Sequence, residues 1–260
     1  MITELIKNCL PMIYSLKKSD SRYSITIGGS RGKELSDSHS DVDFRLYADE
    51  FVDGKNWEVG IADMKKHMDY WAERGLMIDG VWMRRISEID NSLNKWLSGE
   101  IIPEPLEWAI WGYHLPTDLY HQQIIEDPFG IAEGWKKRMN PYPQALKTAL
   151  INKHMNRLKY WKTDYHYKHK VERKDIIFLA SISASLVHDI MQVLCAANEL
   201  YYPGDGHNLS FSKYFALKPN DFEKRIEHIL YPGTSDTLEN QYAAILEMIN
   251  DIQNNCHRFL

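Results

Sequence analysis

The chain has 260 residues, of which 44% are hydrophobic and 26% charged, and these proportions are typical of a globular protein with one large domain or two modest ones. The net charge of −5 argues against a broad nucleic-acid-binding surface, although a local basic patch is compatible with it. Three widely spaced cysteines without a Cys-x-x-Cys pattern predict a reduced, cytoplasmic setting. No signal peptide is evident and no apolar run approaches the roughly 18 residues that span a bilayer, so we expect no membrane partner.

The first half of the chain alternates between helical and strand patterns. Helical spacing covers residues 3–17, 56–74 and 89–97, and strands are indicated over Tyr23–Ile27, Val42–Ala48, Leu76–Ile86 and Gln123–Glu126. Gly75 follows the second helix in the position of a C-terminal glycine, and Gly80 permits a bend inside the third strand. A further helix is expected over Leu106–Tyr113, after the break at Pro103 and Pro105.

The second half is helical. Helical patterns cover residues 143–161, 174–200, 222–230 and 237–255. The segment over 174–200 is long, apolar and free of Gly and Pro, which predicts a buried helix of a bundle. The composition changes near residues 130–140. The expected fold class is therefore α+β, with a mixed sheet and flanking helices followed by a C-terminal helical bundle.

The most informative stretch lies between the first two strands. The strand over Tyr23–Ile27 leads into Gly28-Gly29-Ser30, and ten residues separate Ser30 from Asp41-Val42-Asp43. Glycines and a small hydroxyl residue after a strand let the backbone approach phosphate groups closely. Two carboxylates at positions i and i+2 of a strand point to one face, and Mg²⁺ takes carboxylate oxygens as ligands. The pattern indicates a nucleotidyl-transfer site, in which a short helix opening after Ser30 would contribute amides.

This motif resembles the signature of the nucleotidyltransferase fold, the DNA polymerase beta superfamily, and above all its small bacterial members, which include the antibiotic nucleotidyltransferases. Ser40 and Phe44, which flank the Asp-x-Asp motif, fit the same pattern. A weaker likeness to bacterial members with a helical C-terminal domain extends over residues 125–130, 142–146 and 202–205. The resemblance implies a nucleotidyltransferase domain over residues 1–132, a helical substrate-binding domain over 133–260, and an active cleft between them.

The resemblance also implies roles for single residues. Asp41 and Asp43 would bind Mg²⁺ or Mn²⁺, and Gly29 and Ser30 would bind the β- and γ-phosphates of ATP as co-substrate. Arg31 is well placed to meet phosphate charge, and an exposed surface arginine is an equal alternative.

A third carboxylate usually completes the family's site, on a later strand beside the Asp-x-Asp pair. Here Asp79 is the candidate catalytic and metal-binding acid, because Glu58 and Glu88 lie in helical patterns. Two alternatives stay open. The dipeptide Asp79-Gly80 is also a common turn pair, and Trp82 occupies a position where an acid is expected.

Other chemistry-bearing residues lie in the helical half. Asp175, His188 and Asp189 are candidates for the base that takes the acceptor's proton, and pairing with Lys or Arg is the alternative for them. Residues 159–170 mix basic and aromatic side chains, which fits either a stacking platform for RNA or, as we favour, a solvated loop with aromatics beneath it. His166 and His169 have metal-ligand spacing on a helix, but no third ligand is evident.

Three functions are compatible with these features. The first is transfer of a nucleoside monophosphate, AMP from ATP, to a small hydroxylated acceptor such as an antibiotic. The second is attachment of AMP to a protein, as in some toxin–antitoxin members of the superfamily. The third is nucleotide-binding regulation with little or no turnover. A carboxylate beside Asp41 and Asp43 in space favours transfer over regulation.

Overall fold

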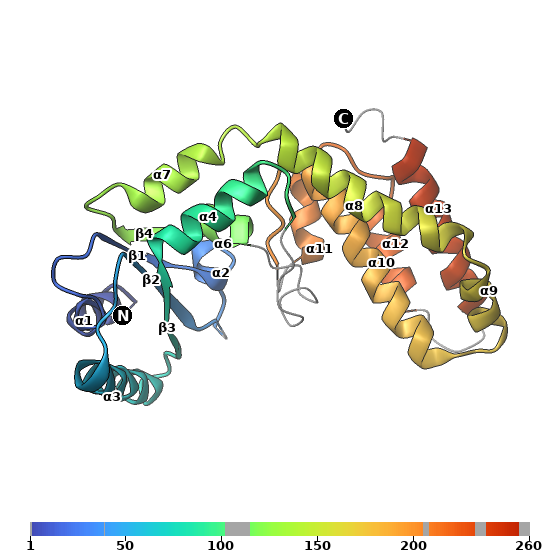
Figure 1. Cartoon of the computed structure of the whole chain (residues 1–260). Coiled ribbons are helices and arrows are strands. Elements are labelled where there is room, and N and C mark those ends of the chain that lie inside the picture. The colour runs from blue at the N-terminus through green and yellow to red at the C-terminus, as the bar shows by residue number, and fades with distance from the viewer. Residues whose placement is uncertain (1, 39, 102–114, 205–207, 232–237, 255–260) are drawn as a thin grey trace. The chain divides into compact units, whose positions relative to one another are not determined.

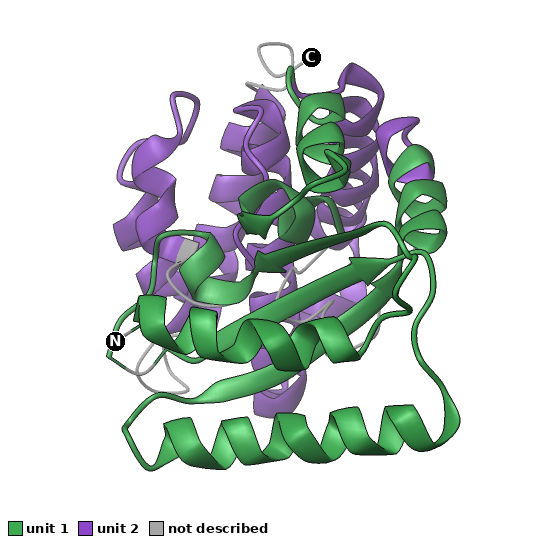
Figure 2. Ribbon diagram, turned by 90° about the vertical axis from the view of Figure 1, so that its left-hand side faces the viewer, with its two compact units in different colours: residues 1–94, 115–141 green, residues 95–114, 142–260 purple. Residues whose placement is uncertain are grey.

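The computed structural model describes residues 2–38, 40–101, 115–204, 208–231 and 238–254 (Figure 1). The chain divides into two compact units, unit 1 with residues 1–94 and 115–141 and unit 2 with residues 95–114 and 142–260 (Figure 2). Unit 1 contains a four-stranded sheet and unit 2 is helical, which confirms the α+β class. The boundary at residue 132 stays a prediction, and the helix expected over Leu106–Tyr113 lies outside the described residues.

Unit 1 consists of a sheet and the helices around it. Its strands are β1 (Tyr23–Ile27), β2 (Val42–Ala48), β3 (Ile78–Arg85) and β4 (Gln123–Glu126). Its helices are α1 (Ile2–Ser15), α2 (Gly29–Gly32), α3 (Gly54–Ala72), α6 (Leu115–His121) and α7 (Ile131–Arg138), and α4 (Ile86–Leu97) ends in unit 2. Three of the four strands have the predicted bounds. We did not predict α6 and α7, because seven and eight residues are too few for a recognisable helical period.

The topology of the sheet brings three chain segments to the beginning of β2. The strand order is β3-β2-β1-β4. β1 pairs antiparallel with β2 and with β4, so the end of β1 lies beside the beginning of β2. β2 and β3 are parallel, so their beginnings also lie side by side, and α3 provides the crossover that a parallel pair requires.

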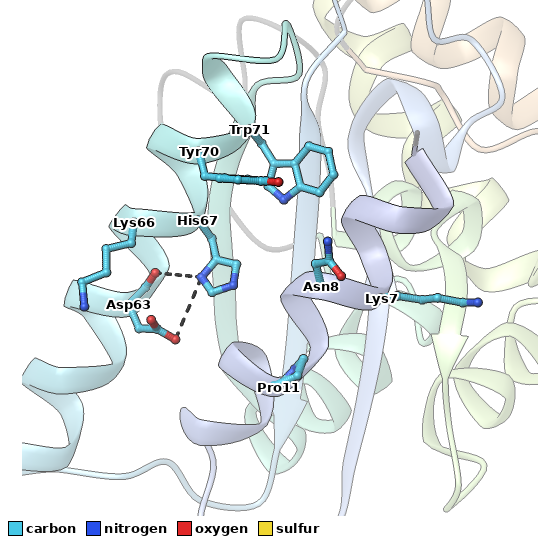
Figure 3. A pocket seen from close by; sticks show the side chains of 8 residues that line it. All are labelled: Lys7, Asn8, Pro11, Asp63, Lys66, His67, Tyr70 and Trp71. Carbon is cyan, nitrogen blue, oxygen red and sulfur yellow. Dashed lines mark hydrogen bonds and ion pairs between the residues drawn. The ribbon is translucent and has the colours of Figure 1, made fainter.

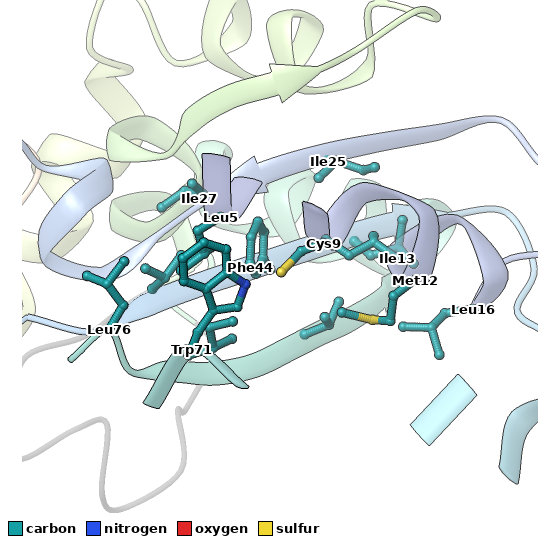
Figure 4. Packing of buried hydrophobic residues seen from close by; sticks show 14 residues of the cluster. Leu5, Cys9, Met12, Ile13, Leu16, Ile25, Ile27, Phe44, Trp71 and Leu76 are labelled. Atoms are coloured by element: carbon teal, nitrogen blue, oxygen red, sulfur yellow. The ribbon is translucent and has the colours of Figure 1, made fainter. Parts of the chain in front are cut away.

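The two faces of the sheet differ in polarity. Ile25, Ile27, Phe44 and Leu46 are buried in an apolar core with residues of α1 and with Trp71 of α3 (Figure 4). Burial of each such side chain contributes about 1.5–3 kcal/mol. The intervening residues of β1 and β2 point to the opposite face because side chains alternate along a strand. Several of these are polar yet buried: Ser24, Thr26, Arg45 and Tyr47.

Unit 2 is built around one apolar helix. Its helices are α8 (Gln144–Thr163), α9 (Tyr165–Glu172), α10 (Ile176–Ala197), α11 (Asn208–Phe211), α12 (Phe222–Leu230) and α13 (Leu238–Asn254), with a 3₁₀ turn over Ser212–Tyr214. α10 packs against α8, α9, α12 and α13, and most of its second half is buried. The prediction of a buried helix over this segment is confirmed.

By length and composition α10 could also cross a membrane. Its most apolar window has a mean hydropathy of 1.6, so the expectation that no segment reaches the spanning length is wrong on composition. Within unit 2, 56% of that window is buried against neighbouring elements.

Candidate metal centre

Three aspartates come together at the beginning of β2. One carboxylate oxygen from each of Asp41, Asp43 and Asp79 lies within 4.8 Å of the other two. Asp41 immediately precedes β2, Asp43 lies in it, and Asp79 is the second residue of β3. The first two are half-buried and Asp79 is exposed. These three acids could hold a metal ion, and in the described part of the chain they are the group of metal-ligating side chains that meets this distance.

An irregularity in the β2–β3 pairing directs Asp79 into the cluster. Val42 pairs with Ile78 and Asp43 pairs with Gly80, so the register shifts at Asp79. Gly80 has a φ angle of 111°, a conformation that favours glycine. Such irregularities bend a strand and re-aim a side chain. The bend predicted at Gly80 is confirmed. Asp79 lies in β3 rather than in a turn, and its side chain is exposed.

The glycines after β1 are required by the side chains of β2. Gly29 has a φ angle of 60°, and a Cβ atom built on it would overlap the carboxylate of Asp43. A Cβ atom on Gly28 would lie 2.8 Å from the guanidinium of Arg45. The backbone N–H of Gly28 donates to the carbonyl of Asp43 at 2.9 Å. The turn therefore lies directly against the acidic cluster, with Ser30 next to it on α2.

Arg31 contacts the loop that leads to Asp41. Its Nε donates to the carbonyl of Asp41 and its Nη2 to the carbonyl of Ser40, both at 2.6 Å. Ser40 in turn hydrogen-bonds with Asp37 through its hydroxyl. These contacts position the backbone before β2, and with it the side chain of Asp41. A role of Arg31 toward phosphate stays a prediction.

A buried cation on the same face was missed by our sequence analysis. Arg45 lies on β2 two residues after Asp43, and its Nη1 is 3.6 Å from Oδ1 of that aspartate. Its Nε donates to Oδ2 of Asp118 in α6 at 3.2 Å, and both side chains of this pair are almost fully buried. The ring of Trp82 covers the guanidinium at 4.7 Å. The i, i+2 spacing after Asp43 was a usable signal for Arg45, whereas no local pattern pointed to Asp118.

The electrostatics of the cluster favour a bound cation. Burial raises the pKa of Asp43 to about 6, and the neighbouring Asp41, Asp79 and Asp118 raise it as well, while Arg45 lowers it. Arg45 lies beside these carboxylates and Arg31 lies against the backbone of Asp41, so four carboxylates still outnumber the two guanidinium groups. Like charges this close disfavour joint ionisation unless a cation lies between them.

The donor set fits a hard divalent ion. All three clustered side chains offer carboxylate oxygens, the ligands preferred by Mg²⁺ and Mn²⁺. Opposite ligands of a Mg²⁺ ion are about 4.2 Å apart, so oxygens 4.8 Å or less apart need only small side-chain rotations to share one ion. Asp79, as the exposed member, leaves one side of the cluster open to a further ligand.

The acids predicted as bases in the helical half have partners within unit 2. Oδ1 of Asp189 is 2.7 Å from Nδ1 of His154 and accepts from Nη1 of Arg157 at 3.1 Å. Burial raises the pKa of Asp189, lowers that of His154, and lowers that of His188 to about 4. Asp175 accepts from the backbone N–H of Phe178 at the beginning of α10 and pairs with Lys170 at 2.8 Å. The alternative of pairing with Lys or Arg holds for Asp175 and Asp189.

A hollow in unit 1 lies between α1 and α3, apart from the three aspartates (Figure 3). Its volume is about 540 Å³, and its lining residues are Lys7, Asn8, Pro11, Asp63, Lys66, His67, Tyr70 and Trp71. His67 uses Nδ1 to contact the backbone carbonyl of Asp63 at 3.0 Å. Figure 3 shows Lys7 and Lys66 extending away from each other on the two helices. With a single carboxylate, this hollow lacks the donor set of a metal centre.

Comparison with known proteins gives one partial match. Residues 117–206 match a family described as "Domain of unknown function (DUF4037)". The match covers about a third of the chain, from α6 to just beyond α10, and includes Asp118 and Asp189 but none of the three clustered aspartates. None of the curated proteins matches the chain.

Proposed function

We propose that this protein transfers a nucleoside monophosphate, AMP from ATP, to a hydroxyl group of a small acceptor, with Mg²⁺ held by Asp41, Asp43 and Asp79. The observation that carries the proposal is the three-carboxylate cluster beside the glycine turn, with its oxygens within 4.8 Å. The mixed sheet and the Gly29-Ser30 turn agree with the nucleotidyltransferase resemblance. The third carboxylate favours transfer over nucleotide-binding regulation without turnover.

The reaction joins the acceptor oxygen to the α-phosphorus of ATP and breaks the bond from that phosphorus to the pyrophosphate oxygen. The hydroxyl proton passes to a base and pyrophosphate leaves. A bound Mg²⁺ ion would neutralise triphosphate charge and lower the pKa of the attacking hydroxyl. The protein's own contribution is positioning and charge, as in phosphoryl transfer generally.

Each residue around the cluster has a distinct part in this proposal. Gly29 lets the backbone come close to the phosphates, since no Cβ atom stands between the turn and the cluster. Arg31 holds the carbonyls of Ser40 and Asp41 and so fixes the first carboxylate. Arg45 lowers the pKa of Asp43 and thereby favours its ionised, ligating form.

The direct test is label transfer. The protein is incubated with each of the four NTPs labelled at the α-phosphate, with Mg²⁺ and a library of hydroxyl compounds that includes aminoglycosides, and products are separated by chromatography. We expect label on a small acceptor with ATP, and none in the presence of EDTA. Label on protein would indicate AMP attachment to a protein instead. Binding of Mg·ATP without label on any acceptor would favour the regulator.

The glycine turn allows a matched control. Gly29→Ala introduces a Cβ atom against Asp43, whereas Gly54→Ala changes a residue with a similar φ angle of 53° and open space around it. Both variants carry the backbone strain of an L-residue in this conformation, about 1–2 kcal/mol. Only Gly29→Ala is expected to weaken Mg·ATP binding. Equal affinities of both variants for Mg·ATP would contradict the proposal that the glycine turn lies against the bound phosphates.

A further inference from the structure

The end of unit 2 where α8, α9 and the beginning of α10 meet carries an excess of positive charge (Figure 1). Residues 153–178, which we call the basic tip, contain eight lysines and arginines and three acids. The tip therefore has a net charge of +5 in a chain whose net charge is −5, so the remaining residues together carry −10. Such an asymmetry orients a protein toward an anionic partner.

The acids of the tip are occupied within it. Asp164 accepts from the backbone N–H of His166 at the beginning of α9, and Asp175 has the corresponding role in α10 while pairing with Lys170. Glu172 approaches Lys168 only at 4.0 Å. Asp164 and Asp175 thus serve as helix caps. Arg157 pairs with Asp189, which lies outside the tip, at 3.1 Å, and the other seven basic side chains still outnumber the three acids of the tip.

Aromatic rings pack against one another beneath the tip. The ring of Trp161 contacts those of Tyr167 and Phe178 edge-on, with centroids 6.2 and 5.9 Å away, and so joins α8, α9 and α10. Tyr167 is buried and also contacts Tyr242 of α13. Our expectation of a solvated loop over residues 159–170 is wrong, because α8 extends to Thr163 and α9 begins at Tyr165. The expectation of aromatics beneath the surface holds for Trp161 and Tyr167 only.

Four large side chains of the tip protrude into solvent instead. Ile177 is 85% exposed and Ile176 is 60% exposed, at the first turn of α10. Tyr165 and Tyr160 are 62% and 58% exposed on the neighbouring helices. The two isoleucines closely follow the exposed Arg173 and Lys174 in the chain, and such a combination of apolar and basic side chains suits a partner that offers both apolar and anionic groups.

We propose that the basic tip binds the surface of an anionic lipid bilayer, with Ile176 and Ile177 entering the boundary between headgroups and acyl chains. Lysines and arginines attract anionic headgroups, tyrosines favour the interfacial region, and aliphatic side chains gain from leaving water. A lipid surface thus accounts for all three kinds of exposed side chain. Single-stranded nucleic acid accounts for the basic and aromatic residues but leaves the isoleucine pair in water.

This proposal replaces our expectation that the protein has no membrane partner, and it does not depend on nucleotide transfer. Attachment would be peripheral, with α10 remaining in the core of unit 2 and only its first turn in contact with lipid. The acidic remainder of the chain would be repelled by the same surface, so unit 2 would bind through its tip.

Vesicle sedimentation tests the proposal with the full chain. Binding is measured to vesicles of phosphatidylcholine alone and of phosphatidylcholine with 30% phosphatidylserine, in 0.1 M and 0.5 M NaCl. We expect binding to the anionic vesicles at low salt, at least tenfold weaker binding to the neutral ones, and a marked loss at high salt. Equal binding to both vesicles, or binding to neither, would overturn the proposal.

Paired variants separate the two contributions. Ile176→Ser with Ile177→Ser should lower affinity for anionic vesicles at least tenfold, and Lys159→Glu with Arg173→Glu should do so independently of the isoleucines. The matched controls lie on unit 1: Val59→Ser with Met77→Ser removes exposed apolar residues, and Lys55→Glu with Lys65→Glu reverses exposed charges. Thermal melting checks that every variant is folded. Controls that lose affinity as strongly as the tip variants would contradict a specific role of the tip.

Two further measurements address other partners. Fluorescence anisotropy with a labelled single-stranded 20-mer RNA tests for nucleic acid, and sedimentation velocity tests for a second copy of the chain. RNA binding that is lost in the Lys159→Glu, Arg173→Glu variant, without vesicle binding, would replace the lipid by nucleic acid. A dimer that Ile176→Ser with Ile177→Ser converts to monomer would identify the tip as a contact between copies.

Discussion

Asp43 in the sheet and Asp189 in the helical unit are both acids with a pKa raised by burial, but their neighbours differ in kind. Asp43 shares its site with Asp41 and Asp79, and its one cationic neighbour, Arg45, is also paired with Asp118. Asp189 meets the imidazole of His154 and the guanidinium of Arg157, and no second acid is among its ion-pair and hydrogen-bond partners in the part of the chain that the structure describes. Burial disfavours the ionised form of both carboxylates, but only Asp43 lies in a cluster of like charge.

The difference separates a cluster of like charge, which a cation would stabilise, from a single carboxylate whose charge the chain's own His154 and Arg157 offset. Around Asp189, groups of α8 meet Oδ1 and hold α8 to α10, while Oδ2 of Asp189 and Nε2 of His154 are buried without a hydrogen-bond partner among the described residues. Around Asp43, the repulsion among carboxylates persists until a cation enters. A raised pKa alone therefore does not identify a functional acid, whereas a raised pKa to which neighbouring acids of a cluster contribute favours a functional role.

Removing two ligands should give the largest effect. We expect Asp41→Asn with Asp43→Asn to weaken Mg·ATP binding ten- to hundredfold for each lost charge-assisted contact, about 1.5–3 kcal/mol each. Isothermal titration calorimetry measures this. Metal-free stability should not fall, because the substitutions relieve repulsion. Asp63→Asn, in the hollow between α1 and α3, is the control. A double variant that binds Mg·ATP like the parent would contradict the assignment of Asp41 and Asp43 as metal ligands.

Removing the buried cation of the sheet tests what keeps the cluster folded. Arg45→Gln leaves Asp118 buried without its ion partner, and such losses cost about 3–5 kcal/mol. Urea unfolding should show this decrease. Arg22→Gln is the matched control, since its pair with Asp49 is at the surface and should contribute at most about 1 kcal/mol. Adding Asp118→Asn to Arg45→Gln should restore part of the loss, and an unchanged midpoint in Arg45→Gln would contradict a supporting role.

The pH dependence of stability should reveal the cluster's charge. The folded protein binds the proton of Asp43 more tightly than the unfolded chain, with a pKa of about 6 against 3.8. The resulting stabilisation is present below pH 3.8 and is lost as the pH rises through 6, by about 3 kcal/mol at most. Mg²⁺ at a hundred times its dissociation constant should raise the free energy of unfolding by about 2.7 kcal/mol above pH 6 and by little at pH 4. Urea midpoints that respond to Mg²⁺ equally at both pH values would contradict the assignment, and Asp43→Asn should flatten both curves.

The core of the candidate site could be predicted from the sequence because its signals are local. Strand alternation, the glycine turn and the i, i+2 aspartates are all expressed within neighbouring residues, and β1 and β2 have the predicted bounds. Asp79 needed a further inference about strand order, which the parallel pairing of β2 and β3 supports.

What could not be predicted depends on contacts between distant segments. Asp118 reaches Arg45 from α6, a helix too short to carry a period of its own. The partners of Asp189 come from α8, and no spacing in the sequence indicates which faces of two long helices meet. The exposure of Ile176 and Ile177 could not be predicted for the same reason, since the sequence of an apolar helix does not indicate which of its side chains face solvent.

The smallest expected effect concerns Asp189 itself. Asp189→Ala leaves Nδ1 of the buried His154 without its partner, and an unsatisfied buried group costs about 1–3 kcal/mol. The half-exposed Arg157 keeps the hydroxyl of Ser185 as an acceptor. The loss in urea unfolding should be the same with and without Mg²⁺, because the acid takes no part in metal binding. Glu172→Ala is the control in the same unit, where the acid lies 4.0 Å from Lys168, both side chains are exposed, and a change within about 1 kcal/mol is expected. A folded Asp189→Ala variant that binds Mg·ATP normally yet loses label transfer would instead assign this acid to the chemistry, as the base for the acceptor's proton, and the contrast between the two buried acids would fail.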